Sequence, residues 1–348
     1  MAHLPTVIDV ARAAGVSRQT VSNVLNSPAV VRPDTRDRVQ AAITSLGYRP
    51  HASARRLRTQ RSSTIGIRLD PMANGISGSI HDRYLHALTE QADARGMRVL
   101  LFTADGPADE IDQFRRLLDG ADVDAFVLTS TFYGDPRTEW LIEHEAPFVT
   151  FGRPWGIDDM NDPQHLWVDV DGRAGVAEAT THLADSGSHR IAYVGWPSPS
   201  GTGDDRRRGW ESVSQQRFGL SGVDLESLQV RTIDVVWDAH AAVTQLLRSD
   251  ASIDGIVCAS DSLALGASLA VTAAGLAELP VIGFDDTPVA QAVGLSSVEQ
   301  RLDEVAAGTL ELLMGAEGRA ILHRDLTPGE AHRLVTPRLV ERRPVRLG

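Results

Sequence analysis

Residues 17–26, SRQTVSNVLN, place several hydrogen-bonding side chains within one short helical pattern. Ser17 is a favourable helix N-cap, and Val21, Val24 and Leu25 recur at the spacing of one apolar helix face. The polar side chains between them therefore share the opposite face, close to the helix N-terminus. A helix that reads base edges in the major groove presents its side chains in this way.

Two more helices are expected around this one. Thr6 and Asp9 have capping-box spacing, which predicts a helix from Val7, and Gly15 supplies a sharp turn. A third helix is predicted at about residues 35–46, with Gly47 as its C-terminal cap. Three short helices make a minimal helix-turn-helix domain, which we expect at residues 1–50. The alternative is a three-helix bundle without a ligand.

Residues 51–63 include a short basic segment, ASARRLR. It has the length of one or two helical turns, which are marginal in water without a partner. Leu57 lies beside Arg55, Arg56 and Arg58, as in a minor-groove wedge flanked by phosphate contacts. The alternative is a disordered basic linker.

The charge of the chain is unevenly distributed. Residues 1–61 contain ten Arg and three Asp, an excess of seven positive charges, although the whole chain has a formal net charge of −12. Residues 62–348 therefore carry −19. Such asymmetry is typical of a basic nucleic-acid-binding module attached to an acidic body.

From Thr64 onward, short apolar runs alternate with helical stretches. The runs are TIGIRL, RVLLFT, AFVLTS, PFVTFG, LWVDV, RIAYVG, DGIVCA and PVIGFD. Alternation of this kind predicts an α/β fold with parallel sheets and right-handed crossovers. One large sheet or two doubly wound lobes would both accommodate these strands.

Polar residues follow several of these strands, where open parallel sheets bind ligands. They are Asp70, Ser130, Arg153, Ser260 and Asp285. We expect Asp261 to cap the following helix instead. The run DDRRRGW, residues 204–210, would place three Arg at a helix start, against the helix dipole, so at least one Arg is expected to point into the ligand crevice.

No catalytic signature is present in the sequence. It has no GxSxG, P-loop, HExxH or GxGxxG after the first strand, so we expect neither an enzyme nor a catalytic residue. The single Cys258 excludes a disulfide framework and a Cys-based zinc site, and no cofactor or metal is expected. No export signal and no apolar run of about 18–20 residues is present, which predicts a cytoplasmic protein without a membrane segment.

The motifs DVARAAGVSRQTVSNVLN, TRDRVQAAITSLGYRP, ARRLRTQ, CASDSLALG and VIGFDD together resemble the LacI/GalR family of bacterial transcription regulators. The resemblance extends from Thr6 to about Arg343. It implies a helix-turn-helix domain, a hinge helix at residues 51–63, and a two-lobed core like a periplasmic sugar-binding protein. The expected lobes are residues 64–166 with 296–330, and residues 167–295 with 331–343. It also implies a homodimer, and without a C-terminal leucine heptad helix we expect a dimer rather than a tetramer tied by such a helix.

The resemblance also implies roles for individual residues. Arg18 and Gln19 would read the major groove, and Leu57 would intercalate at the operator centre. The predicted DNA-contacting residues are Thr6, Ser17, Arg18, Gln19, Thr20, Ser22, Asn23, Asn26, His51, Arg55 and Leu57. The predicted effector-binding residues are Asp70, Ser130, Arg153, Arg206, Trp237, Ser260 and Asp285. Asn23 replaces a frequent Arg and suits adenine, and His51 replaces a frequent Asn.

We therefore predict a sequence-specific regulator, a repressor of pseudo-palindromic operator DNA. Its operator affinity would be changed by a sugar or sugar derivative bound between the lobes. Three alternatives stay open at this point: a purine-type regulator that needs a corepressor, a solute-binding protein without a DNA role, and an enzyme of nucleotide-fold type.

Overall fold

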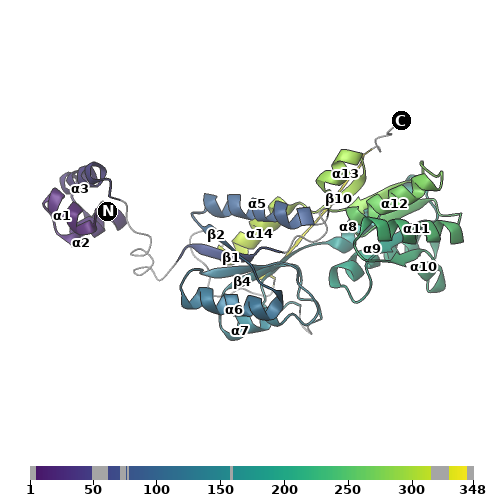
Figure 1. The fold of residues 1–348 in the computed structure, drawn as a ribbon, viewed down its shortest axis with the longest axis horizontal. Helices are drawn as coiled ribbons and strands as arrows, with labels where there is room; N and C mark the ends of the chain where they lie inside the picture. Colours follow the sequence, from purple (N-terminus) through teal and green to yellow (C-terminus); the bar gives the residue numbers. More distant parts are fainter. Residues whose placement is uncertain are drawn as a thin grey trace. The chain divides into compact units, whose positions relative to one another are not determined.

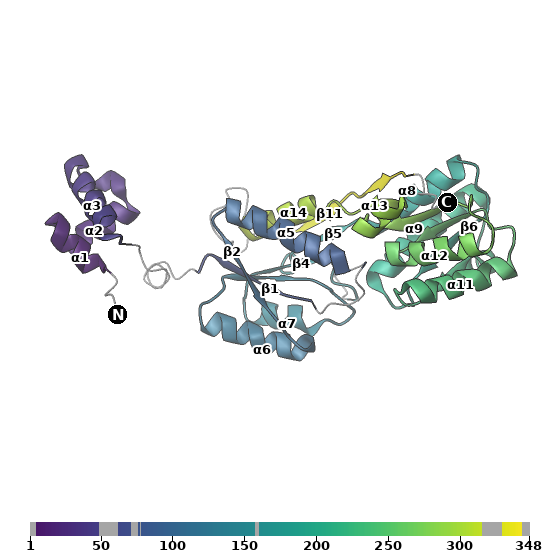
Figure 2. The same cartoon turned by 45° about the horizontal axis from the view of Figure 1, so that its top comes forward.

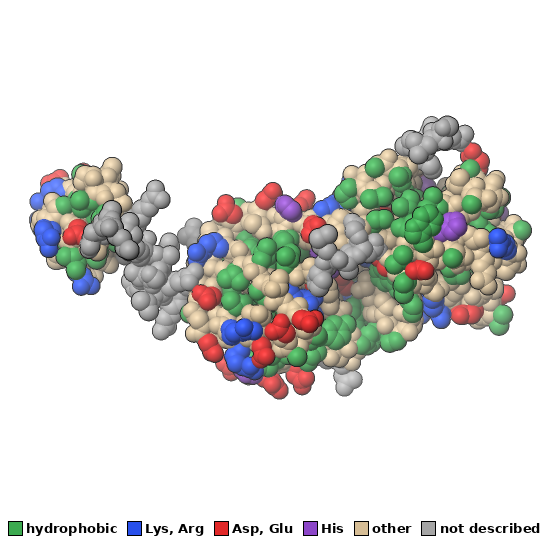
Figure 3. Space-filling view, in the orientation of Figure 1, with side chains coloured by type: hydrophobic (Ala, Val, Ile, Leu, Met, Phe, Trp, Pro, Cys, Tyr) green, Lys and Arg blue, Asp and Glu red, His purple; other side chains and the backbone are tan. Residues whose placement is uncertain are grey.

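The computed structural model describes residues 5–48, 62–70, 76, 78–156, 160–314 and 329–342. The chain divides into two compact units, Met1–Ser62 and Ser63–Gly348. Figure 3 shows Arg side chains on the visible face of the small unit and acidic side chains spread over the larger one.

The small unit contains three helices, α1 (Val7–Ala14), α2 (Arg18–Asn26) and α3 (Pro33–Leu46), with a short 3₁₀ turn, η1 (Pro28–Val30), between the last two (Figure 1). Val10, Val21 and Val39 are fully buried at its centre. The predicted capping box at Thr6 is present, since the backbone N–H of Thr6 donates to the Asp9 carboxylate over 2.8 Å. The third helix begins earlier than predicted, because a proline is favourable at the first helical position.

The first lobe of the larger unit is built on a parallel sheet. Its strands are β1 (Thr64–Arg68), β2 (Arg98–Phe102), β3 (Ala125–Leu128), β4 (Phe148–Phe151), β5 (Trp167–Val170) and β11 (His332–Val335), in the order β11-β5-β4-β3-β1-β2. Helices α5 (Gly78–Ala94) and α14 (Leu302–Met314) cover one face, and α6 (Gly106–Asp119) and α7 (Pro136–Glu143) cover the other (Figure 1).

The second lobe has its own sheet, which is parallel except for an antiparallel edge strand. Its strands are β6 (Ile191–Gly195), β7 (Gln229–Arg231), β8 (Gly255–Cys258), β9 (Val281–Phe284), β10 (Ser296–Glu299) and β12 (Arg338–Val340), in the order β12-β10-β9-β8-β6-β7. Its helices are α8 (Gly172–Asp185), α9 (Gly201–Phe218), α10 (Val223–Ser227), α11 (Val236–Ser249), α12 (Asp261–Ala273) and α13 (Pro288–Val293) (Figure 1 and Figure 2). Of the two arrangements expected, the chain adopts two lobes.

The lobe boundaries differ from those expected. Residues 167–170 and 332–335 were expected in the second lobe, but they form β5 and β11, which pair with each other in the first sheet. Residues 296–299 were expected in the first lobe, but they form β10, which pairs with β9 in the second sheet. The chain thus crosses between the lobes after β5, after β10, and between β11 and β12. Backbone pairing decides to which lobe each strand belongs.

Close packing of the second-lobe helices depends on glycines. A Cβ atom added at Gly209 in α9 would lie 2.3 Å from the backbone carbonyl oxygen of Arg173 in α8. We expect Gly209→Ala to lower the free energy of unfolding by about 1–3 kcal/mol, because backbone atoms cannot yield to an added methyl group as side chains do. Urea unfolding of the full chain measures this. Gly308→Ala in α14 is the control, since its Cβ would first meet the flexible Arg333 side chain. Equal effects of both substitutions would contradict the explanation.

Candidate functional site

The polar face of α2 has the arrangement expected for base reading. Ser17 caps the helix, and its Oγ accepts from the backbone N–H of Thr20 over 3.1 Å. Val21 and Val24 are buried, which leaves Arg18 and Gln19 exposed. The Gln19 side-chain amide donates to the Asn23 Oδ1 over 3.0 Å. This bond holds the two amide groups side by side and so fixes the orientation of the Asn23 NH₂ group.

Other predicted DNA-contacting residues have different surroundings. The Thr6 hydroxyl donates to Asp9 over 2.6 Å and so forms part of the helix cap. Thr20 and Ser22 are partly buried on α2, and Asn26 is its last residue. His51, Arg55, Leu57 and the whole predicted hinge helix lie outside the described residues.

Asp70 and Ser130 meet at the carboxyl ends of β1 and β3 in the first lobe. The Ser130 hydroxyl donates to the Asp70 Oδ2 over 3.2 Å, and His81 Nδ1 lies 2.9 Å from the same oxygen. Arg68 lies 2.5 Å from Oδ1. Burial would raise the pKa of Asp70, but His81 and then Arg68 stabilise the carboxylate and hold its pKa far below the usual range. Asp70 is therefore a fixed acceptor at this edge.

Arg153 follows β4, as predicted, and is held by two carboxylates. Its Nε donates to Asp169 of β5 over 2.7 Å, and its Nη2 donates to Asp205 of α9 over 2.6 Å. Asp205 belongs to the second lobe, so this ion pair joins the two lobes. Burial would lower the pKa of Arg153, but the two carboxylates raise it. The guanidinium is thus held between two carboxylates of the chain itself.

A second contact between the lobes comes from α5. Arg83 Nη1 donates to the backbone carbonyl oxygen of Asp286 over 2.9 Å, and a weaker contact of 3.4 Å reaches that of Asp285. Both acceptors directly follow β9 in the second lobe. Arg83 and Arg153 thus form two interlobe bridges.

Arg206 and Asp285 are brought together at the carboxyl ends of the second-lobe strands. Arg206 Nη1 lies 3.6 Å from the Asp285 Oδ1 and donates over 2.5 Å to the carbonyl oxygen of Ala259. Its guanidinium carbon lies 3.7 Å from the centre of the Phe284 ring. The run of three Arg was expected at a helix start, which is wrong, because Ser200 caps α9 well before Arg206. Arg206 nevertheless points inward, as expected for one Arg of the run, and is 4% exposed.

Asp285 has an unusual backbone and an unusual carboxyl group. Its φ of 112° lies in a region that non-glycine residues rarely adopt, and such strain is concentrated at functional sites. Gln300 donates to its Oδ1 over 2.6 Å. Burial raises the pKa of Asp285 above the usual range; the Arg206 charge opposes this rise, and Asp261 adds to it.

The raised pKa predicts a particular pH dependence. The usual pKa of an Asp is about 4. Between this pH and neutrality, the Asp285 carboxyl is protonated in the folded protein and ionised in the unfolded chain. The contribution of Asp285 to the free energy of unfolding is therefore largest at low pH and decreases as the pH rises. We expect the free energy of unfolding of the wild type, relative to Asp285→Asn, to fall over this range in urea titrations. A constant difference would contradict the assignment.

The cap of α12 is Ser260 and not Asp261. Ser260 caps α12, since its Oγ accepts from the backbone N–H of Leu263 over 3.2 Å, and its hydroxyl donates to Asp234. The prediction that Asp261 caps this helix is wrong, because Asp261 is its first residue. The Asp261 carboxylate instead accepts from Ser297 Oγ over 2.5 Å and from the Thr287 backbone N–H over 2.7 Å. Asp261 thus ties α12 to β10 and to the start of α13.

Trp237 is the aromatic residue predicted to bind the effector, but Trp196 lies closer to Arg206. Trp237 lies in the first turn of α11 and is 69% exposed, and none of its contacts with described residues joins it to Arg206 or Asp285. Trp196 is closer, with its ring 5.4 Å from the Arg206 guanidinium. The Trp196 Nε1 and the Arg206 Nε are buried donors without a hydrogen-bond partner among the described residues. These two donors and the Asp285 carboxylate suit a ligand rich in hydroxyl groups.

The prediction omitted Asp169 and Asp205, which hold Arg153. Asp169 is the single charged residue within the apolar run LWVDV, and a carboxylate inside a buried strand indicates a paired charge. That signal was present in the sequence. Asp205 adjoins Arg206, and no local pattern distinguishes it from its neighbours.

Two absences concern the described part of the chain. It contains no group of three or more His, Cys, Asp or Glu arranged to hold a metal ion. Its helices include none with the length and apolar character needed to cross a membrane.

Comparison with known proteins identifies two matching families and a relative that aligns over most of the chain. Residues 6–51 match the family of bacterial regulatory proteins, lacI family, and residues 180–345 match a periplasmic binding protein-like domain. The HTH-type transcriptional regulator CelR of Thermobifida fusca is 32% identical over 300 residues, which cover 82% of this chain and 84% of CelR.

Two solved structures have a similar fold. The complex of the transcriptional regulator CelR with cellobiose is 26% identical and aligns with a TM-score of 0.65, covering 97% of this chain and 99% of that one. The lac repressor dimer bound to operator and the anti-inducer ONPF aligns with a TM-score of 0.75, covering 98% of both chains at 23% identity.

Proposed function

The chain belongs to the lacI family of bacterial regulatory proteins and is a DNA-binding transcriptional regulator, and from this premise we propose that it is a sugar-responsive repressor. A small carbohydrate bound between the two lobes would change its affinity for operator DNA. The protein would act in the cytoplasm as a homodimer on a pseudo-palindromic operator.

The effector proposal rests on Arg206 and Asp285, which lie together at the carboxyl ends of the second-lobe strands. The pair combines a strained backbone, an acceptor with a raised pKa, and the unpartnered Arg206 Nε. Trp196 adds an aromatic face and a second unpartnered donor. Aromatic faces with a carboxylate and an Arg are suited to a sugar ring. The name of the CelR complex, which includes cellobiose, supports the same ligand class.

The DNA side of the proposal rests on α2. Two copies related by a two-fold axis would place two such helices one helical turn apart, so a palindromic site follows from the symmetry of the dimer. The seven excess positive charges of residues 1–61 would contact phosphates, and we expect binding to weaken steeply with salt.

Communication between the two sites requires two states. A ligand shifts such an equilibrium only through different affinities for the two states. The interlobe bridges, Arg83 and Arg153, join residues of opposite lobes next to Asp285 and Arg206. A sugar that changes the separation of the lobes would therefore lengthen or break these bridges. The two states would differ in whether the Arg83 and Arg153 contacts are formed.

The assignment of Arg18 is tested by base preference. Arg18→Ala is expected to relax the preference at one position of each half-site and to cost about 1–3 kcal/mol on the selected operator. The measurement is selection from random duplexes followed by competition binding. Arg38→Ala on α3 removes the same charge from an exposed position and should leave the preference unchanged. An Arg18 variant with the wild-type preference would refute the assignment.

The effector class is tested by thermal unfolding of the full chain with individual sugars and nucleobases. A ligand present at about 100 times its Kd stabilises the protein by about 2.7 kcal/mol, which raises the melting temperature by several degrees. Cellobiose, galactose and ribose are the first probes. We expect a shift with a sugar that is absent in Asp285→Asn. A shift with purines alone would favour a purine-type corepressor instead.

A further inference from the structure

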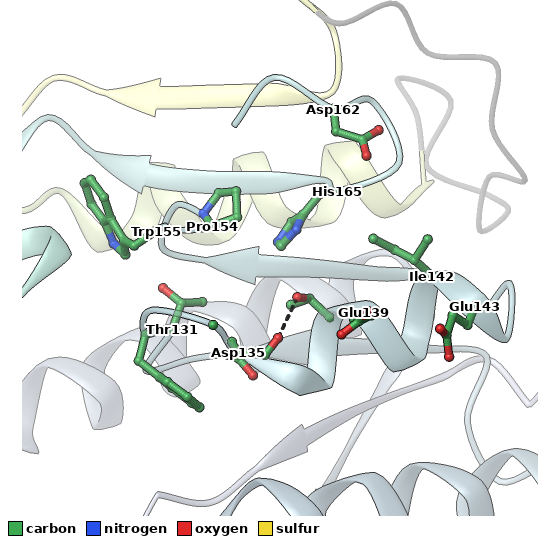
Figure 4. Close-up of a pocket in the computed structure, with 12 residues that line it drawn as sticks. Thr131, Asp135, Glu139, Ile142, Glu143, Pro154, Trp155, Asp162 and His165 are labelled. Carbon is green, nitrogen blue, oxygen red and sulfur yellow. Dashed lines mark hydrogen bonds between the residues drawn. The ribbon is translucent and has the colours of Figure 1, made fainter. Parts of the chain in front are cut away.

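The turn that follows β4, residues 152–156, reaches from the first lobe to the second. Figure 4 shows Pro154 and Trp155 together on this turn, with Trp155 directed away from the labelled side chains of α7. The Trp155 ring packs on Gly201, the first residue of α9, so closely that a Cβ atom added at Gly201 would lie 2.1 Å from the Trp155 Cγ. Because α9 belongs to the second lobe, this is a further contact between the lobes.

The turn is fixed within the first lobe. The carbonyl oxygen of Arg153 accepts from the backbone N–H of Trp155 over 2.9 Å and from the hydroxyl of Thr131, after β3, over 3.1 Å. Gly152 has a φ of 121°, which favours glycine, and a Cβ atom there would lie 2.4 Å from the Thr131 Oγ1. Trp155 therefore cannot withdraw from α9 without breaking contacts inside its own lobe.

Arg153 and Trp155 hold the same part of α9. The Arg153 guanidinium lies 4.4 Å from the centre of the Trp155 ring, a cation–π distance, and its Nη2 donates over 2.6 Å to Asp205, about one turn beyond Gly201. We call the contacts of Trp155 with Gly201 and of Arg153 with Asp205 the lobe latch. Trp155 is 6% exposed, so opening the lobe latch would expose a large apolar side chain to water.

The lobe latch adjoins the effector site of the proposed function. Arg206 directly follows Asp205 on α9, and Arg206 and Asp285 are each 4% exposed. A sugar can contact groups that are buried this deeply only when the elements around them move. Since α9 carries both Arg206 and the second-lobe half of the lobe latch, a movement of α9 away from the first lobe would open the latch.

We propose that the lobe latch opposes the effector: it holds the lobes in the state that excludes the sugar, and it opens when the sugar binds. This inference rests on the proposed function, because it concerns the regulation of the same site. A ligand that binds one of two states loses apparent affinity when the other state is stabilised. Trp155 is then a positioning residue that sets the sugar concentration of the response without contacting the sugar.

The test is titration of the full-length wild type and its variants with cellobiose, galactose and ribose. Gly201→Ala places a methyl group against the Trp155 ring and should tighten sugar binding by about fivefold or more, as expected for coupled equilibria. In the background of Trp155→Ala the same substitution should have no further effect, because the ring that it meets is gone. Trp140→Ala in α7 is the matched control, since its ring contacts lie within the first lobe, and it should bind as the wild type does.

A second measurement does not depend on the sugar. Spin labels on cysteines introduced at the exposed Asp119 of α6 and Gln245 of α11 report the separation of the lobes, because the single native Cys258 is fully buried. Gly201→Ala should change this distance, and Trp140→Ala should not. If no sugar bound the wild type, the proposed effector would fail, whereas the distance would still decide whether the lobe latch exists.

Three results would overturn the lobe latch. They are unchanged or weaker sugar binding in Gly201→Ala, an equal effect of Gly201→Ala with and without the Trp155 ring, and an unchanged distance between the labels in Gly201→Ala. A residue that only stabilised the fold would not tighten sugar binding when its contact is disturbed. A cooperative urea transition shows that each variant is folded, and Gly201→Ala decides alone if Trp155→Ala does not fold.

Discussion

Replacing Arg153 by methionine is expected to lower the free energy of unfolding by about 3–5 kcal/mol, because it leaves buried carboxylates without a counter-charge. The side chains of Asp169 and Asp205 are only 7% and 10% exposed. Burial already raises the pKa of Asp169, although the Arg153 charge opposes that rise. Without Arg153, the two buried carboxylates would have no counter-charge, and water would have to enter to solvate them. Urea unfolding of the full chain near neutral pH measures the effect.

The matched control removes the charges together with the arginine. Arg153→Met combined with Asp169→Asn and Asp205→Asn should recover most of the lost stability, since no unpaired charge remains buried. Arg333→Met is a second control, because its ion pair with Glu311 is almost half exposed and contributes little. A loss below about 1 kcal/mol in Arg153→Met would show that water screens this bridge.

The second large effect is expected at Asp285. Asp285→Asn keeps the size of the side chain and an acceptor for Gln300, but above neutral pH, where the Asp285 carboxyl is ionised, it removes the charge that faces Arg206. We expect sugar binding to weaken by about 1.5–3 kcal/mol, roughly 10- to 100-fold, which is the contribution of a hydrogen bond to a charged group. Operator affinity without sugar should change little. Titration of the variant with the sugar that stabilises the wild type measures this.

Asp238→Asn is the matched control for this substitution. Asp238 lies in the same lobe, in the first turn of α11, and is exposed. The variant should bind the sugar as the wild type does. Unchanged sugar binding in Asp285→Asn would place the effector elsewhere in the molecule.

The small unit could be predicted well from the sequence, because its signals are local. The capping box at Thr6, the left-handed Gly15 with a φ of 64°, and the N-cap at Ser17 are each decided by residues within one helical turn. The alternation of strands and helices was equally clear in the larger unit. The two-sheet architecture followed from the family resemblance and is confirmed.

The lobe boundaries show what sequence reasoning could not predict. The run LWVDV fits a buried parallel strand in either sheet, and its partner β11 lies far later in the chain, at residues 332–335. Pairing at such sequence separation leaves no periodic signal near the strand. Expecting residues 167–170 in the second lobe was therefore wrong, although the strand itself was correctly predicted.

The candidate site shows the same limit. The inward-pointing Arg of the run DDRRRGW was inferred from a helix start that the structure places at Gly201. Arg153 was correctly expected at the end of β4, but its partners Asp169 and Asp205 come from two other elements. Ser260 and Asp261 are adjacent, and either is an acceptable N-cap, so only the backbone geometry decides between them.

The most direct test of the central claim is operator binding in the presence and absence of the sugar. Fluorescence anisotropy would follow the full-length protein on an operator selected from random duplexes, with wild type and Asp285→Asn in parallel. We predict that a saturating sugar, with cellobiose as the first probe, changes the wild-type Kd for operator by about tenfold or more. The Asp285→Asn Kd should not change at the same concentration. An equal change in both proteins, or no change in either with any sugar that stabilises the wild type, would contradict the account.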